Sequence, residues 1–223
     1  MISLKFTCEK SKLVEALSNV QKAVSQKSTI AALEGILITA KNTGIIELCG
    51  YNTELGITTS VCGTVKKDGQ IVLNARLLTE IVRKLPEDLV QIEVSAQLSA
   101  KIAGGSSVFE LVGIDASEFP SLPTIENAKC FELPVLDLKN MIRQTVFAVS
   151  EADTNPIHTG TLFEIKNKNI TLVSVDGYRL ALRSEPIEIW SYRLWCREKR
   201  CGKFCIFCRI PMRRLKYLQV CAI

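Results

Sequence analysis

The stretch SKLVEALSNVQKAVS, residues 11–25, decides the fold because the chain contains a second version of it. At an offset of 125 residues it aligns with LDLKNMIRQTVFAVS, residues 136–150. The register continues without a gap on both sides, and ten of the 37 positions from 6 to 42 are identical to their counterparts. Agreement at one fixed offset over this length indicates a duplicated domain rather than a shared composition.

Both copies have the spacing of an amphipathic helix that follows a strand and precedes a hairpin. Apolar residues recur at helical spacing, with Lys and Gln on the other face of the first copy. These apolar positions are Leu13, Leu17, Val20 and Val24 in the first copy and Leu138, Ile142, Val146 and Val149 in the second. The predicted hairpins are GILITAKNTGIIELCGY, residues 35–51, and GTLFEIKNKNITLVSVDG, residues 160–177, with KNTG and KNKN at their turns.

The first copy continues for another 70 residues or so before the second begins. A second helix is predicted over residues 75–85 with Asn74 as its N-terminal cap, and a meander over residues 91–113 turns at Gly104 and Gly105. The segment IDASEFPSLPTIENA, residues 114–128, closes the copy and links it to the next. One unit therefore has two helices and roughly eight strands, which predicts an α+β fold class.

The repeat predicts a complete first domain at residues 1–123 and the first half of a second at 124–188, followed by a tail at 189–223. The tail holds nine Lys or Arg and one acid, whereas residues 1–188 have a net charge of −3. We interpret the tail as an out-of-frame product, because a shifted reading of its codons gives a strand, helix and strand in the order of residues 71–94. The alternative is a two-module adaptor whose basic, Cys-rich tail binds zinc or nucleic acid. The cysteines concerned are Cys196, Cys201, Cys205 and Cys208.

Several features favour a cytoplasmic, non-catalytic protein. No run of 18 apolar residues occurs, and the start of the chain lacks the basic-then-apolar order of a signal peptide. His158 is the single histidine, and no Ser or Cys with an acid forms a triad pattern with it. The sequence AGGSS, residues 103–107, lacks the Gly-Lys-Ser/Thr that ends a phosphate loop. We therefore predict no catalytic residue, no metal and no cofactor.

Six motifs carry a resemblance to a known family, among them KFTCEKSKLVEAL at residues 5–17, FELVGIDASEFPSLP at 109–123 and LVSVDGYRLAL at 172–182. In order and spacing they resemble the first two domains of the bacterial DNA sliding clamps, the beta subunits of DNA polymerase III holoenzyme. The resemblance implies repeated processivity-fold domains, each with two helices packed on antiparallel sheets. It further implies three such domains per chain, of which this chain lacks the third, and a head-to-tail homodimer that closes a ring around duplex DNA. Such a ring tethers a DNA-directed DNA polymerase, a nucleotidyltransferase, without catalysing a reaction itself.

The resemblance also implies two kinds of site. The residues that face DNA would be Lys27, Arg76, Arg83 and Arg143. Half of a groove for short linear peptides of the polymerase and other clamp-binding proteins would consist of His158, Val175, Gly177, Tyr178, Arg179 and Leu180. A clamp loader would be a further partner. The plain alternatives are that the four basic residues are ordinary solvated charges and that SVDGYRL is an ordinary strand–turn–strand element of the core.

The absence of a third domain leads to two expectations. The chain as written would not close a ring around DNA, because each third domain would have to meet the partner's first domain. The half-domain would also expose the apolar strand face of NITLVSVDG, residues 169–177, and be prone to aggregate.

Overall fold

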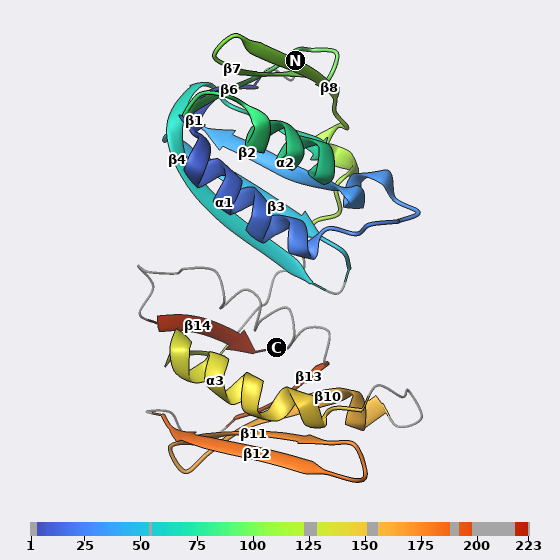
Figure 1. Ribbon diagram of the computed structural model, residues 1–223, viewed down its shortest axis with the longest axis vertical. Coiled ribbons are helices and arrows are strands. Elements are labelled where there is room, and N and C mark those ends of the chain that lie inside the picture. Colours follow the sequence, from blue (N-terminus) through green and yellow to red (C-terminus); the bar gives the residue numbers. More distant parts are fainter. Residues whose placement is uncertain are drawn as a thin grey trace. The chain divides into compact units, whose positions relative to one another are not determined.

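The computed structural model describes residues 4–53, 55–122, 129–150, 156–187, 192–197 and 217–222, and for 129–133, 156, 192–197 and 217–222 it describes the backbone alone. The chain forms two compact units, Met1–Pro123 (unit 1) and Thr124–Ile223 (unit 2). Both units begin with the same series of elements (Figure 1).

Within the described residues, unit 1 combines two α-helices with one eight-stranded antiparallel sheet. The strands are β1 (Leu4–Glu9), β2 (Gly35–Lys41), β3 (Ile45–Tyr51), β4 (Gly56–Lys67), β5 (Gly69–Asn74), β6 (Leu89–Val94), β7 (Ser99–Gly104) and β8 (Ser107–Val112). The helices are α1 (Lys10–Val20) and α2 (Ala75–Lys84), with short 3₁₀ helices η1 (Gln21–Ala23), η2 (Ala31–Glu34) and η3 (Ala116–Glu118). The strand order is β5-β2-β3-β4-β1-β6-β7-β8. The predicted α+β class and element content are confirmed.

The long strand β4 joins the two halves of this sheet. It pairs with β3 up to Cys62, which lies opposite Ile45, and it pairs with β1 from Gly63, which lies opposite Cys8. Gly63 also donates its amide to the Gly44 carbonyl at 2.9 Å. A single continuous sheet results, although the strand changes partner in the middle of its length.

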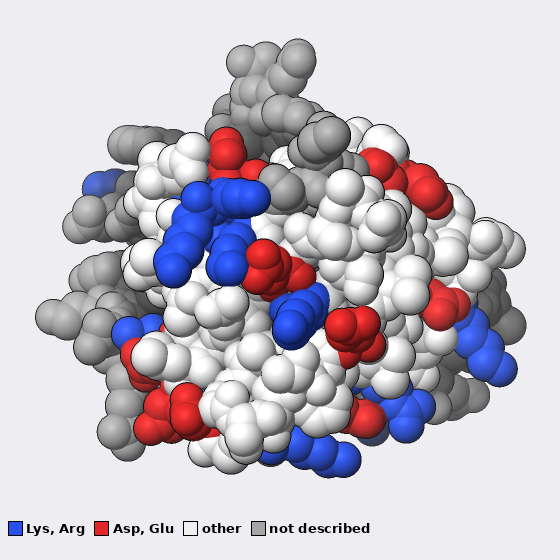
Figure 2. Space-filling view, turned by 90° about the horizontal axis from the view of Figure 1, so that it is seen from above, with Lys and Arg blue, Asp and Glu red and all other residues white. Residues whose placement is uncertain are grey.

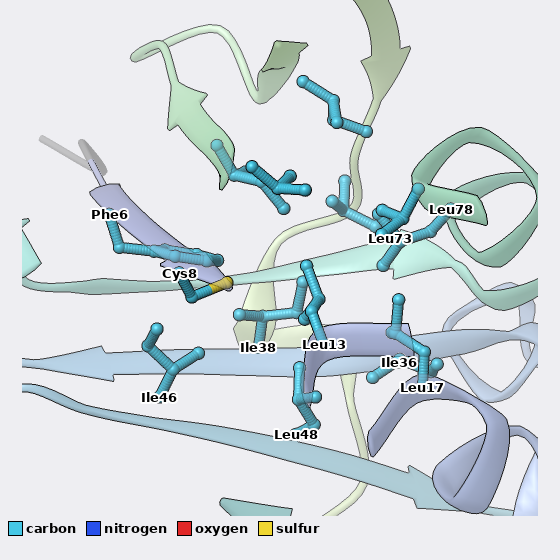
Figure 3. Close-up of a cluster of buried hydrophobic side chains, with 14 of the residues drawn as sticks. Phe6, Cys8, Leu13, Leu17, Ile36, Ile38, Ile46, Leu48, Leu73 and Leu78 are labelled. Atoms are coloured by element: carbon cyan, nitrogen blue, oxygen red, sulfur yellow. The ribbon is translucent and has the colours of Figure 1, made fainter. Parts of the chain in front are cut away.

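Helices α1 and α2 lie side by side over one face of the sheet and form the main core with it (Figure 1). Figure 3 shows side chains from both helices among those of β1, β2, β3 and β5. The fully buried members include Phe6, Leu13, Leu17, Ile36, Ile38, Ile46, Leu48, Leu73 and Leu78. The helical spacing of the apolar residues thus predicted the buried stripe of α1 correctly. Asn74 caps α2 as expected, because its Oδ1 accepts the Leu77 amide at 3.1 Å.

The opposite face of the sheet carries a row of charged residues across neighbouring strands. Lys5 lies between Lys67 of β4 and Glu93 of β6, and Glu93 lies opposite Lys101 of β7. The Lys5 Nζ is 2.7 Å from the Glu93 Oε2. This bond, more than the nearby charges of Lys67 and Lys101, holds the pKa of Glu93 below its usual range. Basic and acidic side chains also lie next to one another on the face of the molecule shown in Figure 2. Such interspersed charges suit a solvated surface.

Unit 2 opens with elements that each begin 125 residues after their counterparts in unit 1. These are β9 (Lys129–Pro134), α3 (Val135–Thr145), η4 (Val146–Ala148), η5 (Pro156–Thr159) and β10 (Gly160–Lys166). They are followed by β11 (Asn169–Val175), β12 (Leu180–Pro186), β13 (Tyr192–Arg197) and β14 (Tyr217–Ala222). One sheet has the order β12-β11-β10-β13, and β14 pairs with β9 in a second. The ungapped repeat therefore predicted these first five positions correctly.

Both predicted hairpins form, but their turns differ by one residue. In unit 1 the pair Lys41–Ile45 encloses three residues, and Gly44 has a φ of +80°. In unit 2 the pair Lys166–Asn169 encloses only Asn167 and Lys168, with φ values of +52° and +60°. Positive φ at both central residues is the signature of a tight type I′ turn. Beyond this turn, corresponding residues of the two units are therefore 124 positions apart.

The sequence predicted that the apolar face of NITLVSVDG, residues 169–177, is exposed, and this prediction is wrong. Ile170 and Leu172 of β11 are completely buried, and α3 packs on β11. Alternation along the strand places Val173 on the other face, where it is partly buried. The periodic stripe of α3 covers the sheet as that of α1 does in unit 1. Most of the tail predicted at residues 189–223 lies outside the described residues.

Candidate functional site

The predicted DNA-facing residues of α2 lie on one exposed side of that helix. Arg76 and Arg83 are seven residues apart, a spacing that brings side chains to the same helix face. Arg76 Nε is 3.1 Å from Glu80 Oε1, one turn along, so this charge is partly neutralised. Arg83 Nη2 donates to Ser18 Oγ at 2.9 Å and thereby links α2 to α1. Arg83 keeps its full positive charge because its partner is neutral.

Lys27 and Arg143 are the other two predicted DNA-facing residues, and both are exposed. Lys27 lies between η1 and η2 of unit 1, and its carbonyl oxygen accepts the Ser25 hydroxyl at 3.0 Å. Arg143 is in the last turn of α3, where a positive charge complements the helix dipole. Among the described residues, neither side chain has an acidic group within ion-pairing distance. Like the charge of Arg83, and unlike that of Arg76, their charges are therefore not offset by an acidic partner within the described residues.

The predicted peptide-binding residues centre on a tight loop between β11 and β12. Asp176 Oδ1 accepts the amides of Tyr178 and Arg179, both at 3.0 Å, and Asp176 Oδ2 is 2.7 Å from Arg179 Nε. The Tyr178 amide is the largest of the favourable contacts that lower the pKa of Asp176. Gly177 has a φ of +91°, which side chains rarely tolerate. The aspartate therefore fixes the direction in which the two following side chains leave the loop.

The structure adds Phe147 of η4 to this region, which the sequence analysis did not include. The Arg179 guanidinium carbon is 5.9 Å from the centre of the Phe147 ring, and 57% of Phe147 is exposed. A cation over an aromatic face is attracted by the ring quadrupole. Phe147 lies outside the apolar stripe of the preceding helix, and this off-stripe aromatic is the signal that identifies it in the sequence.

The remaining predicted groove residues are placed as follows. Tyr178 is fully exposed, Leu180 is 64% exposed, and Val175 lies opposite Leu180 at the start of the β11–β12 pair. The structure thus brings Val175, Gly177, Tyr178, Arg179 and Leu180 together at one end of the hairpin. His158 lies in η5, before β10, and its carbonyl oxygen accepts the Ser150 amide at 2.9 Å.

The described residues contain no cluster of His, Cys, Asp or Glu able to hold a metal ion. Three of the four tail cysteines considered for zinc lie outside these residues, and of Cys196 only the backbone is described. No described helix is long and apolar enough to cross a membrane.

Two family models match consecutive parts of the chain. Residues 4–123 match the DNA polymerase III beta subunit, N-terminal domain, and residues 132–193 match the central domain of the same subunit. The chain belongs to the DNA polymerase III beta subunit family. The resemblance found in the sequence motifs and the repeated sliding-clamp fold are thereby confirmed.

Individual members of the sliding-clamp family agree with this assignment. The beta sliding clamp of Bacillus subtilis is 40% identical over 194 residues, which cover 83% of this chain and 51% of that protein. A crystal structure of the Bacillus subtilis sliding clamp has a TM-score of 0.92 at 35% identity, covering 99% of this chain and 60% of the other. The clamp of Bartonella birtlesii bound to griselimycin has a TM-score of 0.88 at 25% identity, with the same coverage. The chain spans about half the length of the curated relatives it matches.

Proposed function

We propose that this chain acts as part of a DNA sliding clamp, which encircles duplex DNA and confers processivity on a replicative polymerase. The observation that carries the proposal is the match of both units, in order, to the first two domains of the DNA polymerase III beta subunit. The role is non-catalytic, and it is exercised in the cytoplasm, where the bacterial DNA lies. The adaptor alternative has no support among these matches.

The proposed DNA contact lies on the side of each unit that carries the helices. A tether that slides must attract phosphates without contacts to base edges, since base contacts would hold it at one sequence. Lys27, Arg76, Arg83 and Arg143 are exposed cations at or near the helices, and flexible side chains of this kind suit phosphate contacts. Arg76 contributes least, because Glu80 competes for its charge.

A second subunit would dock at β8, the last strand of the unit 1 sheet. An edge strand presents unpaired backbone groups that can continue a sheet into another chain. Val108, Phe109 and Val112 of β8 are 51%, 41% and 85% exposed. This edge strand and its apolar side chains support a docking surface for the partner subunit of the ring that the resemblance implies for the intact family, and a clamp loader would be the partner that opens that ring.

The loop around Asp176 would bind short peptides of the polymerase and of other clamp-binding proteins. Tyr178 and Leu180 offer exposed apolar surface, and Arg179 offers a cation held in place by Asp176 and Phe147. Extended peptides are commonly recognised by apolar anchors in such surfaces. The Bartonella birtlesii clamp bound to griselimycin supports a ligand site in the family.

Griselimycin is the probe for this site. We expect the purified chain to bind it in calorimetry, and Leu180→Asp to weaken binding at least about tenfold, because a carboxylate replaces an apolar contact. The matched control is Leu136→Asp, which changes an equally exposed leucine on α3 of the same unit. Failure of the unmodified chain to bind, or equal losses in both variants, would refute the groove assignment.

The out-of-frame origin of residues 189–223 is part of the same proposal. It is supported by the local charge of +8 and by the loss of similarity to the first copy in this region. Sequencing the gene from native DNA across codons 185–225 provides the test. We expect one base gained or lost there and a corrected frame that resumes the repeat. An unchanged frame would show that the tail is encoded as it stands.

A further inference from the structure

The sheet of unit 1 has a second apolar face, away from α1 and α2, at strands β5, β2 and β3. Val72, Leu37 and Cys49 lie opposite one another in a row across these strands, and Tyr51 is two residues further along β3. Val72 and Cys49 are buried at 1% and 8% exposure. We call this surface, Leu37, Cys49, Tyr51 and Val72, the connector face.

The connector face is covered by the chain's own segment at residues 113–122, the connector. Phe119 is 7% exposed and belongs to the same buried cluster as Cys49 and Val72, and Leu122 packs against this cluster. The connector is fastened at its start, where Ile114 and Val72 exchange backbone hydrogen bonds of 2.9 and 3.1 Å. Beyond Asp115, whose carboxylate accepts the Ser117 amide, the connector is held on the face by the two apolar anchors.

The connector face corresponds in position to the proposed peptide site of unit 2. Leu37 and its partner Cys49 correspond to Leu162 and its partner Val173, and the pair Tyr51–Gly56 corresponds to Val175–Leu180. These residues occupy the same register positions in the two sheets. The correspondence follows from the repeat and not from the chemistry of the side chains.

The loops next to the two surfaces are also built in the same way. The Asn52 side chain accepts the Leu55 amide at 2.8 Å, as the Asp176 side chain accepts the Arg179 amide. The Asn52 amide donates to the Leu55 carbonyl at 3.2 Å, and the Asp176 amide donates to the Arg179 carbonyl at 3.3 Å. The residue after each Asx has positive φ, +69° at Thr53 and +91° at Gly177.

One substitution between the copies makes room for the connector. A Cβ atom added at Gly56 would lie 2.5 Å from Leu122 Cδ2, so Leu122 occupies the space that a side chain at position 56 needs. The corresponding residue of unit 2 is Leu180, whose side chain is 64% exposed. Unit 1 therefore has an anchor from the connector at the place where unit 2 has a side chain of its own sheet.

From these observations we propose that the connector face is a second peptide site, closed by residues 116–122 of the same chain. The ligand class is an extended segment with an aromatic residue and a leucine three positions later, as in Phe119–Leu122. The site opens when the connector lifts beyond Asp115, and a segment of the same chemistry then binds in trans. This inference rests on the proposed function in one respect: the ligand class, a peptide, is taken from the proposed site of unit 2.

Cys49 reports directly on whether the site is open. Its thiol lies within the cluster under the connector, and burial raises the pKa of Cys49. Cys62 is exposed and serves as the fully reactive reference. Cys8 belongs to the main core, where burial raises the pKa of its thiol to about 12, so its alkylation reports unfolding of the whole unit.

The test measures alkylation of each cysteine in the full chain by peptide mapping. In the double variant Phe119→Ala, Leu122→Ala we expect Cys49 to be alkylated at least about tenfold faster relative to Cys62, since both anchors of the connector are lost. Cys8 should remain as slow as in the unmodified chain. A synthetic peptide of residues 114–123, IDASEFPSLP, should restore protection of Cys49, whereas the same peptide with Ala at both anchor positions should not.

A third variant separates this site from the one in unit 2. The double variant is combined with Leu180→Asp, which disables the proposed unit 2 groove. Protection of Cys49 by the peptide in this background supports a site in unit 1. Loss of protection there, no protection in either background, or equal acceleration of Cys8 and Cys49 overturns the inference. None of these results bears on griselimycin binding to the unmodified chain, so failure of the proposed function remains distinguishable.

Discussion

Replacing Gly63 by valine is expected to destabilise unit 1 by at least about 3 kcal/mol, the upper range for overpacked sites. A Cβ atom at Gly63 would lie 2.6 Å from the Thr7 carbonyl oxygen and 2.7 Å from Ile46 Cδ1. The first neighbour is backbone and cannot rotate away. Relief would require β1 and β4 to separate where β4 changes its partner. Urea denaturation followed by circular dichroism gives the free energy of unfolding directly.

The matched control for Gly63→Val is Thr64→Val, at the next position of the same strand. Thr64 is exposed, and valine has nearly its shape and strand propensity, so we expect a change below about 0.5 kcal/mol. Gly63→Ala should fall between the two, because it introduces the clashing Cβ without the two methyl groups. A Gly63→Val chain within 1 kcal/mol of the unmodified chain would show that the close approach of β1 and β4 is not needed.

The partner change at Gly63 is also where sequence reasoning reached its limit. The repeat and the apolar spacing predicted the helices, the hairpins and the cap at Asn74, because each depends on residues close together in the chain. The division of β4 between β3 and β1 depends on a contact between Gly63 and Thr7, which are far apart in sequence. Nothing in the strand itself distinguishes Gly63 from an ordinary strand glycine.

The connector shows a second kind of limit. Its sequence, with Pro120 among polar residues, predicts a linker, and within residues 113–122 the structure has one short 3₁₀ helix, η3, and no longer helix or strand. It says nothing about Phe119 and Leu122, which pack on a sheet face that exists only after β5, β2 and β3 have paired. Two isolated apolar residues have no period from which burial could be inferred.

The candidate sites were predictable to different degrees. The Arg76–Glu80 pair follows from helical spacing alone, whereas the Arg83–Ser18 bond joins two helices and needed the structure. The Asp-Gly dipeptide at 176–177 predicts a tight turn, but the bonds that orient Arg179 depend on how the turn closes. The family resemblance identified the loop residues as candidates for peptide binding, and the contact of Phe147 with Arg179 was visible only in the structure.

The double charge reversal Lys27→Glu, Arg143→Glu is expected to have the largest effect on DNA binding. These two exposed side chains are not paired with an acid as Arg76 is, and they do not link two helices as Arg83 does, so both are available for phosphate contacts. Removal of two phosphate contacts should reduce the slope of log affinity against log salt concentration by about 1.8. At about 50 mM salt we expect the affinity for a 20-base-pair duplex to fall at least about tenfold. Fluorescence anisotropy of a labelled duplex over a series of salt concentrations measures both quantities.

The double variant could weaken DNA binding because it removes specific contacts or because it lowers the net charge of the chain. A control variant with the same change in net charge at another surface distinguishes the two. Lys67→Glu, Lys101→Glu reverses two lysines on the sheet face opposite the helices, close to Glu93. Net charge acts on duplex DNA at long range, so this control should shift affinity slightly and leave the salt slope nearly unchanged. Equal effects from the two double variants would mean that the helical side has no special place in DNA binding. If Lys27→Glu, Arg143→Glu reduces the affinity and the salt slope more than the control does, the phosphate contacts lie on the face on which the helices pack. The reason is that only short-range contacts release counterions from the duplex.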